Sequence, residues 1–184
     1  MRVKTLLAVV VIVAFAGLAL SAVAMAAEKK METPKPGPEH KKLDVFVGTW
    51  TGQGEMMKSP FGPGGKMTWT ETCEWFPGGF QVICKSKGDG PMGQTEGLGI
   101  MTYNPEEQVY VFMGADSTGW TGTGRGEASK DGWNFKSEEK VNGKTIKSRY
   151  KMHVPSPGTM TSKWEMMNEA GVWETVMEGK ATKK

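Results

Sequence analysis

The sequence contains little of what catalytic and metal sites are built from. It has 2 histidines and 2 cysteines in 184 residues, so a histidine-rich zinc site is excluded. A histidine-based triad would have to use His40 or His153, and both are expected to be surface residues without a catalytic role. We therefore expect no enzyme activity, no catalytic residue, no metal ligand and no cofactor.

An excess of charge of one sign is also missing. The chain carries 23 Lys+Arg against 20 Asp+Glu, a formal net charge of +3. Nucleic-acid-binding proteins show a strongly basic surface, so no nucleic-acid partner is expected. The Ala, Leu, Glu and Lys surplus of a helical bundle is absent too. The 25 glycines and 7 tryptophans favour an all-β domain instead.

The N-terminal segment 1–26 has the layout of a secretory signal peptide. Arg2 and Lys4 precede an apolar stretch from Leu6 to Leu20, and small residues lead to Ala26. The apolar stretch is shorter than the roughly 20 residues that a membrane-spanning helix needs. We expect cleavage after Ala26, no stable membrane anchor afterwards, and a periplasmic or secreted protein.

Residues 27–38 are expected to form a flexible leader, because they are charged, rich in proline and without an apolar period. Residues 39–184 form the expected domain. It opens with a short helix at 39–46 and continues as strand-length segments divided by turn signals, among them Gly78-Gly79 and Asn142-Gly143. This spacing predicts about ten antiparallel strands.

The segment around Gly78-Gly79 can be given a register from the sequence alone. A two-residue turn at these glycines places Cys73 opposite Cys84 and Glu71 opposite Ser86. An even pair of cysteines in an exported protein at directly opposite positions predicts a disulfide, although such a turn gives the pair the wider, hydrogen-bonded spacing. Two buried thiols are the alternative. One face of this hairpin is largely apolar: Met67, Trp69, Cys73, Trp75, Phe80 and Val82.

A turn at Asn142-Gly143 likewise separates the apolar and polar side chains of a second hairpin onto opposite faces. It places Trp133 opposite Met152 and Phe135 opposite Tyr150, all on one face. The other face carries charges, including Lys136 and Arg149, and the same register turns His153 outward. Further along, alternation places Met160, Trp164 and Met166 on one face, and Trp173, Thr175 and Met177 on one face.

A sheet with one apolar face must cover it. Short sequential strands without intervening helices favour closure into an up-and-down barrel over a sandwich, and a barrel of more than about eight strands has room for a ligand cavity. Gly122, Gly124 and Gly126 alternate on one segment that no helix follows. They therefore indicate close packing, a bend or a ligand against a strand, and not a phosphate-binding loop. Arg125 lies on the opposite, outward face.

Several motifs resemble a known family. A short helix leading into Gly48-Thr49-Trp50 resembles the opening of lipocalin-like (calycin) barrels, whose tryptophan plugs one end. Gly78-Gly79-Phe80, Glu96-Gly97-Leu98-Gly99 and Tyr103-Asn104 are similar to motifs of exported bacterial lipocalin-like domains of unknown function. The resemblance implies a barrel and no reaction. Two departures are clear: the Arg-x-Tyr clamp of fatty-acid-binding proteins has no counterpart, and no histidine follows His153 to ligate haem iron.

The leading hypothesis is an exported barrel that binds a small apolar molecule. The residues expected to line or plug its cavity are Trp50, Trp69, Glu71, Trp133, Phe135, Tyr150 and Trp164, with Glu71 as the polar anchor. A second hypothesis is an envelope interaction or structural module with a filled barrel. The third is a barrel enzyme that uses Glu71 or Tyr150 as acid or base, which first requires a raised Glu71 pKa in an open cavity.

Overall fold

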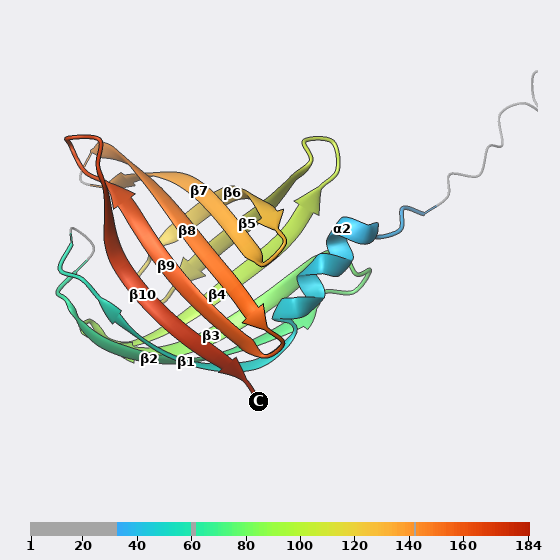
Figure 1. Cartoon of the computed structure of the whole chain (residues 1–184), viewed down its shortest axis with the longest axis horizontal. Coiled ribbons are helices and arrows are strands. Elements are labelled where there is room, and N and C mark those ends of the chain that lie inside the picture. Colours follow the sequence, from blue (N-terminus) through green and yellow to red (C-terminus); the bar gives the residue numbers. More distant parts are fainter. Residues whose placement is uncertain (1–32, 60–61, 142) are drawn as a thin grey trace, which may run out of the picture. The chain divides into compact units, whose positions relative to one another are not determined.

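A computed structural model of the chain describes residues 33–59, 62–141 and 143–184 (Figure 1). The expected signal peptide, 1–26, and the first part of the expected leader, 27–32, lie outside the described residues. Residues 33–37 have no regular secondary structure. Among the described residues, no helix is both long and apolar enough to span a membrane.

Two consecutive helical segments occupy the place of the expected short helix. They are α2 (Pro38–Lys41) and the 3-10 helix η1 (Lys42–Phe46), and Pro38 stands at the first helical position, where its missing N–H costs nothing. Leu43 and Phe46 are buried. The expectation of a surface His40 is wrong: it shares this buried face, its Nδ1 accepts a hydrogen bond from the Gly37 N–H (3.1 Å), and its ring packs edge-on against Phe80.

The rest of the described chain forms a closed antiparallel barrel in which each strand pairs with its sequence neighbours and β1 pairs with β10. Its strands are β1 (Gly48–Met56), β2 (Gly65–Trp75), β3 (Gln81–Gly90), β4 (Gly93–Asn104), β5 (Val109–Asp116), β6 (Thr121–Ser129), β7 (Gly132–Val141), β8 (Lys144–Ser156), β9 (Thr159–Met167) and β10 (Trp173–Lys183). The predicted up-and-down barrel is confirmed.

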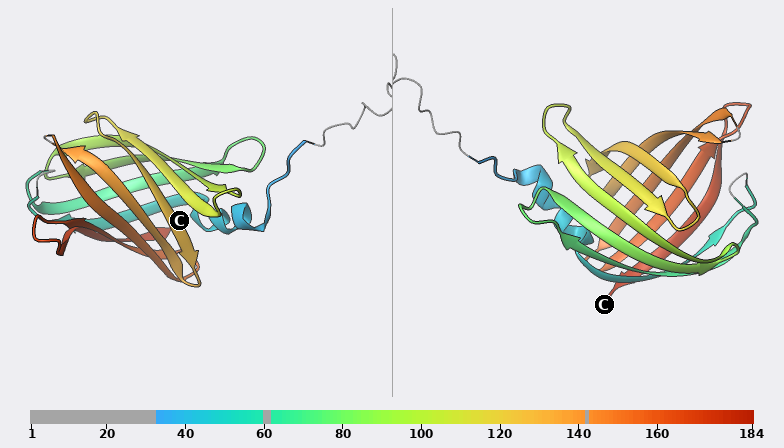
Figure 2. Two further views of the ribbon diagram at one scale, coloured as in Figure 1. Left: turned by 90° about the horizontal axis from the view of Figure 1, so that it is seen from above. Right: turned by 180° about the vertical axis from the view of Figure 1, so that it is seen from behind.

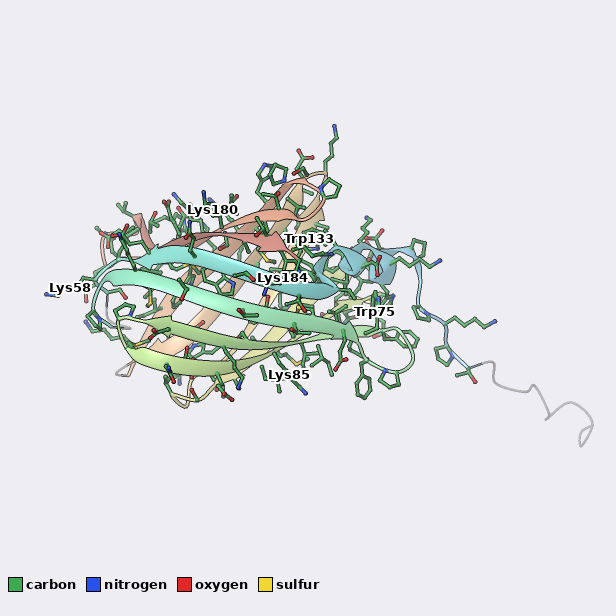
Figure 3. The ribbon with its side chains drawn as sticks, turned by 90° about the horizontal axis from the view of Figure 1, so that it is seen from below. Lys58, Trp75, Lys85, Trp133, Lys180 and Lys184 are labelled. Carbon is green, nitrogen blue, oxygen red and sulfur yellow. A yellow bond between two sulfur atoms is a disulfide. The ribbon has the colours of Figure 1, made fainter. Side chains whose placement is uncertain are left out.

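The helical segments lie at the end of the barrel where β1 begins (Figures 1 and 2). The up-and-down order places the β1–β2, β3–β4, β5–β6, β7–β8 and β9–β10 connections at the opposite end. Seen from below in Figure 3, Lys85 and Lys180 project outward from the barrel wall, and Lys58 projects from the β1–β2 connection. The fold therefore has one end covered by α2 and η1 and one end bounded by loops.

The predicted register of β2 and β3 is confirmed, with Cys73 opposite Cys84 and Glu71 opposite Ser86. The turn differs from the expected one. The Phe76 N–H donates to the Gln81 carbonyl (2.8 Å), so the loop holds four residues, 77–80. A two-residue and a four-residue loop with the same centre give the same register but exchange hydrogen-bonded and non-hydrogen-bonded pairs. The cysteines thus occupy the closer type of site, with Cα atoms 4.0 Å apart, and form the predicted disulfide.

The register of β7 and β8 is also as predicted, with Trp133 opposite Met152 and Phe135 opposite Tyr150. Gly143 adopts a φ of 79°, a left-handed conformation that glycine accepts without steric cost. His153 is exposed on the outer face, as expected.

The expected common face of Trp173, Thr175 and Met177 is wrong. The pairing of β10 with β9 shifts between Thr175 and Met177, and an extra residue in a strand reverses the faces beyond it. Met177 therefore lines the interior. Trp173 lies outside, where the Arg149 guanidinium stands 4.3 Å from the centre of its ring.

Glycines on the inner wall make room for tryptophan rings. A Cβ added to Gly52 or Gly179 would come within 2.1 Å or 2.6 Å of the Trp69 indole, and one added to Gly122 would come within 2.4 Å of the Trp120 indole. These rings therefore lie flat against the backbone of neighbouring strands. The close-packing interpretation of the alternating glycines in β6 agrees with this arrangement.

Candidate ligand-binding cavity

The barrel encloses a cavity of about 440 Å³ to which all ten strands contribute. Its wall is mostly aromatic and methionine side chains: Phe46, Trp50, Trp69, Phe112, Trp120, Phe135, Tyr150 and Trp164, with Met56, Met92, Met101, Met152, Met160 and Met177. Such rings bury a large apolar area in defined orientations, and methionine adapts its shape to what it contacts. The wall suits a small apolar molecule.

The structure brings most of the predicted site residues together. The side chains at the cavity wall are Trp50, Trp69, Glu71, Phe135, Tyr150 and Trp164. Trp133 is not among them: its ring packs against Phe46 (centroids 4.8 Å apart) and Tyr110 (6.4 Å), near the helical end in Figure 3. Its place is in the packing beneath the cavity. That the others bind a ligand stays a prediction.

Trp50 closes the helical end of the cavity. It is 1% exposed, and its Nε1–H donates to the Phe46 carbonyl (2.8 Å). The Lys183 ammonium lies 5.0 Å from the centre of the indole and donates to the Val45 carbonyl (3.0 Å). The hydrogen bonds from β1 and β10 hold η1 across the barrel end.

Glu71 projects from β2 into the cavity. Burial raises the pKa of its carboxyl group above the ordinary value, and it takes part in no ion pair among the described residues. The carboxylate lies within 4.8 Å of the Cys73 and Cys84 sulfurs. Because those sulfurs are bonded to each other, they present no thiolates to a metal ion.

Tyr150 faces the same space from β8. Burial is the main cause that raises the Tyr150 pKa to about 12, and the nearby Glu71 charge raises it further. A hydrogen bond with Ser162 acts in the opposite direction. The phenol is therefore neutral at physiological pH and acts as a hydrogen-bonding group. The Glu71 pKa is raised by burial, which is the direction that the enzyme hypothesis requires of this carboxyl group.

A polar strip on β7 and β8 runs up the wall toward the loop end. The Ser137 and Ser148 hydroxyls are 2.7 Å apart, and the Ser137 hydroxyl donates to Glu139 Oε1 (3.3 Å). The Trp120 Nε1–H donates to Glu139 Oε2 (3.2 Å). These polar groups satisfy one another within the described wall.

Sequence reasoning missed Phe112, Trp120 and Asp116. Phe112 alternates with Tyr110 along β5, a signal that would have placed both inward. Trp120 follows a turn in which Asp116 Oδ1 accepts hydrogen bonds from the Thr118 N–H (2.8 Å) and hydroxyl (2.6 Å). An aspartate two residues before a threonine and near a glycine is a turn signal, but it does not show that the Trp120 ring lines the cavity.

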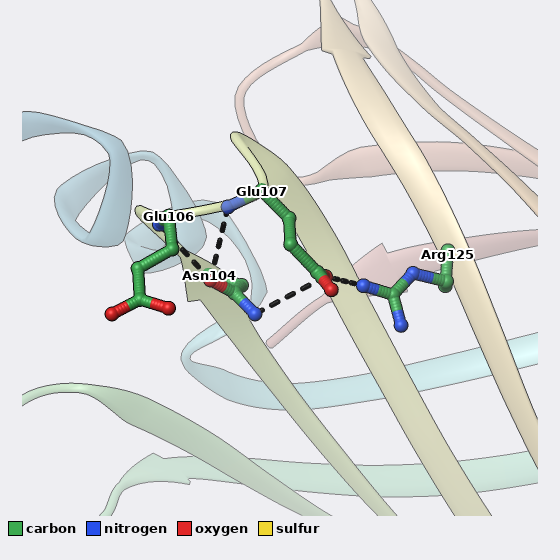
Figure 4. A network of polar contacts seen from close by, with 4 residues as sticks. All are labelled: Asn104, Glu106, Glu107 and Arg125. Atoms are coloured by element: carbon green, nitrogen blue, oxygen red, sulfur yellow. Dashed lines mark hydrogen bonds and ion pairs between the residues drawn. The ribbon is translucent and has the colours of Figure 1, made fainter.

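The Arg125 side chain lies outside the cavity. Arg125, expected to face outward, is exposed and pairs with Glu107. Figure 4 shows the connection between β4 and β5, in which Glu107 lies. There Asn104 Nδ2–H donates to Glu107 Oε2 (3.2 Å), and Asn104 Oδ1 accepts from the Glu106 N–H (3.0 Å). None of the described residues that line the cavity is a lysine, arginine or histidine.

These features define a single antiparallel β-barrel with an internal, mainly apolar cavity. The chain belongs to the family described as Protein of unknown function (DUF1579), which matches residues 35–183. The expectation of a barrel domain of unknown function is thereby confirmed, while its lipocalin-like and exported character stays a prediction. No curated protein matches the sequence significantly.

The fold is shared by a solved structure. The crystal structure of Rv2717c from M. tuberculosis superposes with a TM-score of 0.56 at 11% identity, over 80% of this chain and 98% of that one. A de novo designed fluorescence-activating β-barrel gives a TM-score of 0.44 at 15% identity over 77% and 95% of the two chains. The EF1p2_mFAP2b structure bound to DFHBI gives 0.45 at 11% identity over 79% and 98%.

Proposed function

We propose that this protein binds a small, largely apolar molecule inside the barrel. The observation that carries the proposal is the cavity of about 440 Å³ with its aromatic and methionine wall, since ligand sites are concave, mostly apolar and hold a few placed polar groups. Glu71 and Tyr150 would be those polar groups. Burial of the ligand's apolar surface would supply the binding free energy.

The proposal includes export, with residues 1–26 as a signal peptide, 27–38 as a leader and 39–184 as the lipocalin-like domain. The Cys73–Cys84 disulfide supports an oxidising location, because disulfides persist outside the cytosol. A protein of the periplasm or the extracellular medium would meet its ligand there.

The alternative, an interaction module, is supported by an apolar strip on the outer wall. Ile83, Ile100 and Met113 are successive partners across β3, β4 and β5, and Leu98 lies beside them, with Leu98 44% and Met113 39% exposed. Patches of this kind mark interaction surfaces. The cavity, however, supports the ligand-binding proposal over the filled barrel that this alternative assumes.

The ligand-binding proposal is tested with Nile red, an uncharged probe that fluoresces in apolar surroundings. We expect saturable binding at one site per chain. Gly124→Leu should weaken it at least about tenfold, because Gly124 lines the cavity and an added Cβ there meets Phe135 at 3.4 Å, an ordinary contact distance. The leucine side chain would then occupy space that the probe needs.

Thr121→Leu is the matched control. Thr121 is exposed on the same strand and pairs with Ala115 on the outer wall, so the same side chain added there should leave Nile red affinity unchanged. Circular dichroism checks that both variants fold. Equal affinities for the two variants, or no saturable binding by the native protein, would favour the interaction module.

A further inference from the structure

The titratable carboxyl groups at the cavity wall are not balanced by cations. Glu71, Asp116 and Glu139 line the cavity, and no lysine, arginine or histidine is found among its described lining residues. Lys183, at the helical end, donates to the Val45 carbonyl and lies 5.0 Å from the centre of the Trp50 ring. The interior is therefore acidic as well as apolar.

The three acids differ in how far the protein already uses them. Asp116 accepts hydrogen bonds within its own turn, and Glu139 accepts them from Ser137 and Trp120. Glu71 is in no ion pair among the described residues, and its pKa is raised by burial alone. A buried carboxylate is costly unless a partner compensates its charge, so Glu71 is the group with most to gain from a cation.

The surroundings of Glu71 suit an organic cation. Trp50 is its direct neighbour across the β1–β2 pairing, and Trp69, Tyr150 and Trp164 share the same cavity. The faces of such rings attract cations, with tryptophan the strongest. A ligand that offers an ammonium group to Glu71 and an aryl or alkyl body to the rings would satisfy both parts of the wall.

We propose that the cavity selects a lipophilic organic cation, an amine or quaternary ammonium with an aromatic or branched apolar body, whose charged nitrogen lies beside Glu71. This inference rests on the proposed ligand-binding function and specifies its ligand class. Fatty acids and other apolar anions would be rejected, because their carboxylate would meet three acidic side chains and no described cation.

The pH dependence follows from the same contact. A bound cation favours the ionised form of Glu71, so cation affinity should rise with pH through the raised pKa of this group, and binding should release a proton where Glu71 is still partly protonated. Of the other titratable groups at the cavity wall, Tyr150 has a pKa of about 12 and stays neutral in this range, while Asp116 and Glu139 accept hydrogen bonds from Thr118 and Trp120.

The test uses isothermal titration calorimetry to compare three ligands that share a naphthyl group and differ in charge. Naphthylmethylamine is the cation, naphthylmethanol the neutral analogue and naphthoate the anion. We expect the cation to bind about tenfold or more tightly than the alcohol and naphthoate most weakly. Glu71→Gln keeps the shape of the side chain and should remove the preference for the amine, while the affinity for the alcohol stays within about twofold.

Glu74→Gln is the matched control, because Glu74 is exposed on the same strand and should leave all three affinities unchanged. Equal binding of amine and alcohol by the native protein, or tighter binding of naphthoate, overturns the cation proposal and leaves the ligand-binding function standing. Failure of all three ligands and of Nile red to bind overturns both. Since the comparison of ligands uses the native protein, it remains decisive if Glu71→Gln does not fold.

Discussion

Two glutamates show how the position of a residue on a strand sets its chemistry. Glu71 faces the cavity from β2, and burial raises its pKa. Glu165 lies on the outer side of β9 and is 8% exposed. Its Oε2 accepts a hydrogen bond from Arg149 Nε (2.6 Å) and pairs with Lys151 Nζ (2.8 Å). The Arg149 hydrogen bond is the main cause that lowers the Glu165 pKa to about 2, against the opposing effect of burial.

Glu165→Gln should lower the free energy of unfolding at neutral pH by about 1 to 3 kcal/mol, because two cations would lose a partly buried partner. The native carboxylate has a depressed pKa, so its contribution is present above the ordinary value of 4.5 and is lost as the pH falls toward 2. Urea unfolding at several pH values should show the two proteins converging in acid.

The control for this substitution is Glu138→Gln. Glu138 and Lys147 form an ion pair at 3.8 Å on the exposed face of β7 and β8, and exposed pairs contribute little. Its effect should stay below about 0.5 kcal/mol at every pH. If both substitutions give the same pH profile, the Arg149–Glu165–Lys151 cluster does not stabilise the fold.

At the scale of elements, the registers of two hairpins followed from the sequence. The β2–β3 and β7–β8 pairings were predicted because turn residues and the alternation of apolar side chains specify the same register. The turn length and the bulge in β10 were not. A bulge leaves no strong mark in the residue pattern, so Trp173 was assigned to the wrong face.

Replacing both cysteines, Cys73→Ala with Cys84→Ala, tests the β2–β3 pairing. The disulfide closes a loop with a sequence separation of 11, so its loss should lower the free energy of unfolding by about 2 to 3 kcal/mol, or less because the hairpin keeps the unfolded segment compact. Urea unfolding measures the difference. The native protein unfolded in a reductant should lose a similar amount, whereas unchanged stability in both cases would show that the bridge constrains nothing.

At the scale of the whole molecule, the barrel depends on contacts that are remote in sequence. β1 closes on β10, and η1 covers the helical end with Leu43 and Phe46, which are 0% and 3% exposed. Phe46 also lines the cavity. Phe46 therefore both stabilises the barrel and forms part of the wall of the candidate site.

Leu43→Ala should lower the free energy of unfolding by about 2 to 5 kcal/mol, because the removed methyl groups leave a void between η1 and the barrel. It should also weaken Nile red binding, since a loosened η1 leaves the cavity less enclosed. Lys42→Ala, next to it and exposed, should change neither quantity appreciably. Equal effects of the two substitutions would contradict the role of η1 as a plug.

The sequence by itself determined the barrel class, two hairpin registers, the disulfide pair and the inward position of Glu71. These features are local: alternation along a strand and turn residues act over a few neighbouring positions. The tertiary structure alone decided which inward residues meet. Closure of the barrel placed Phe112 and Trp120 in the cavity wall, Trp133 in the packing against Phe46, and His40 in a buried position. These contacts join segments that are far apart in the sequence, and the periodicity of a single strand does not predict such contacts.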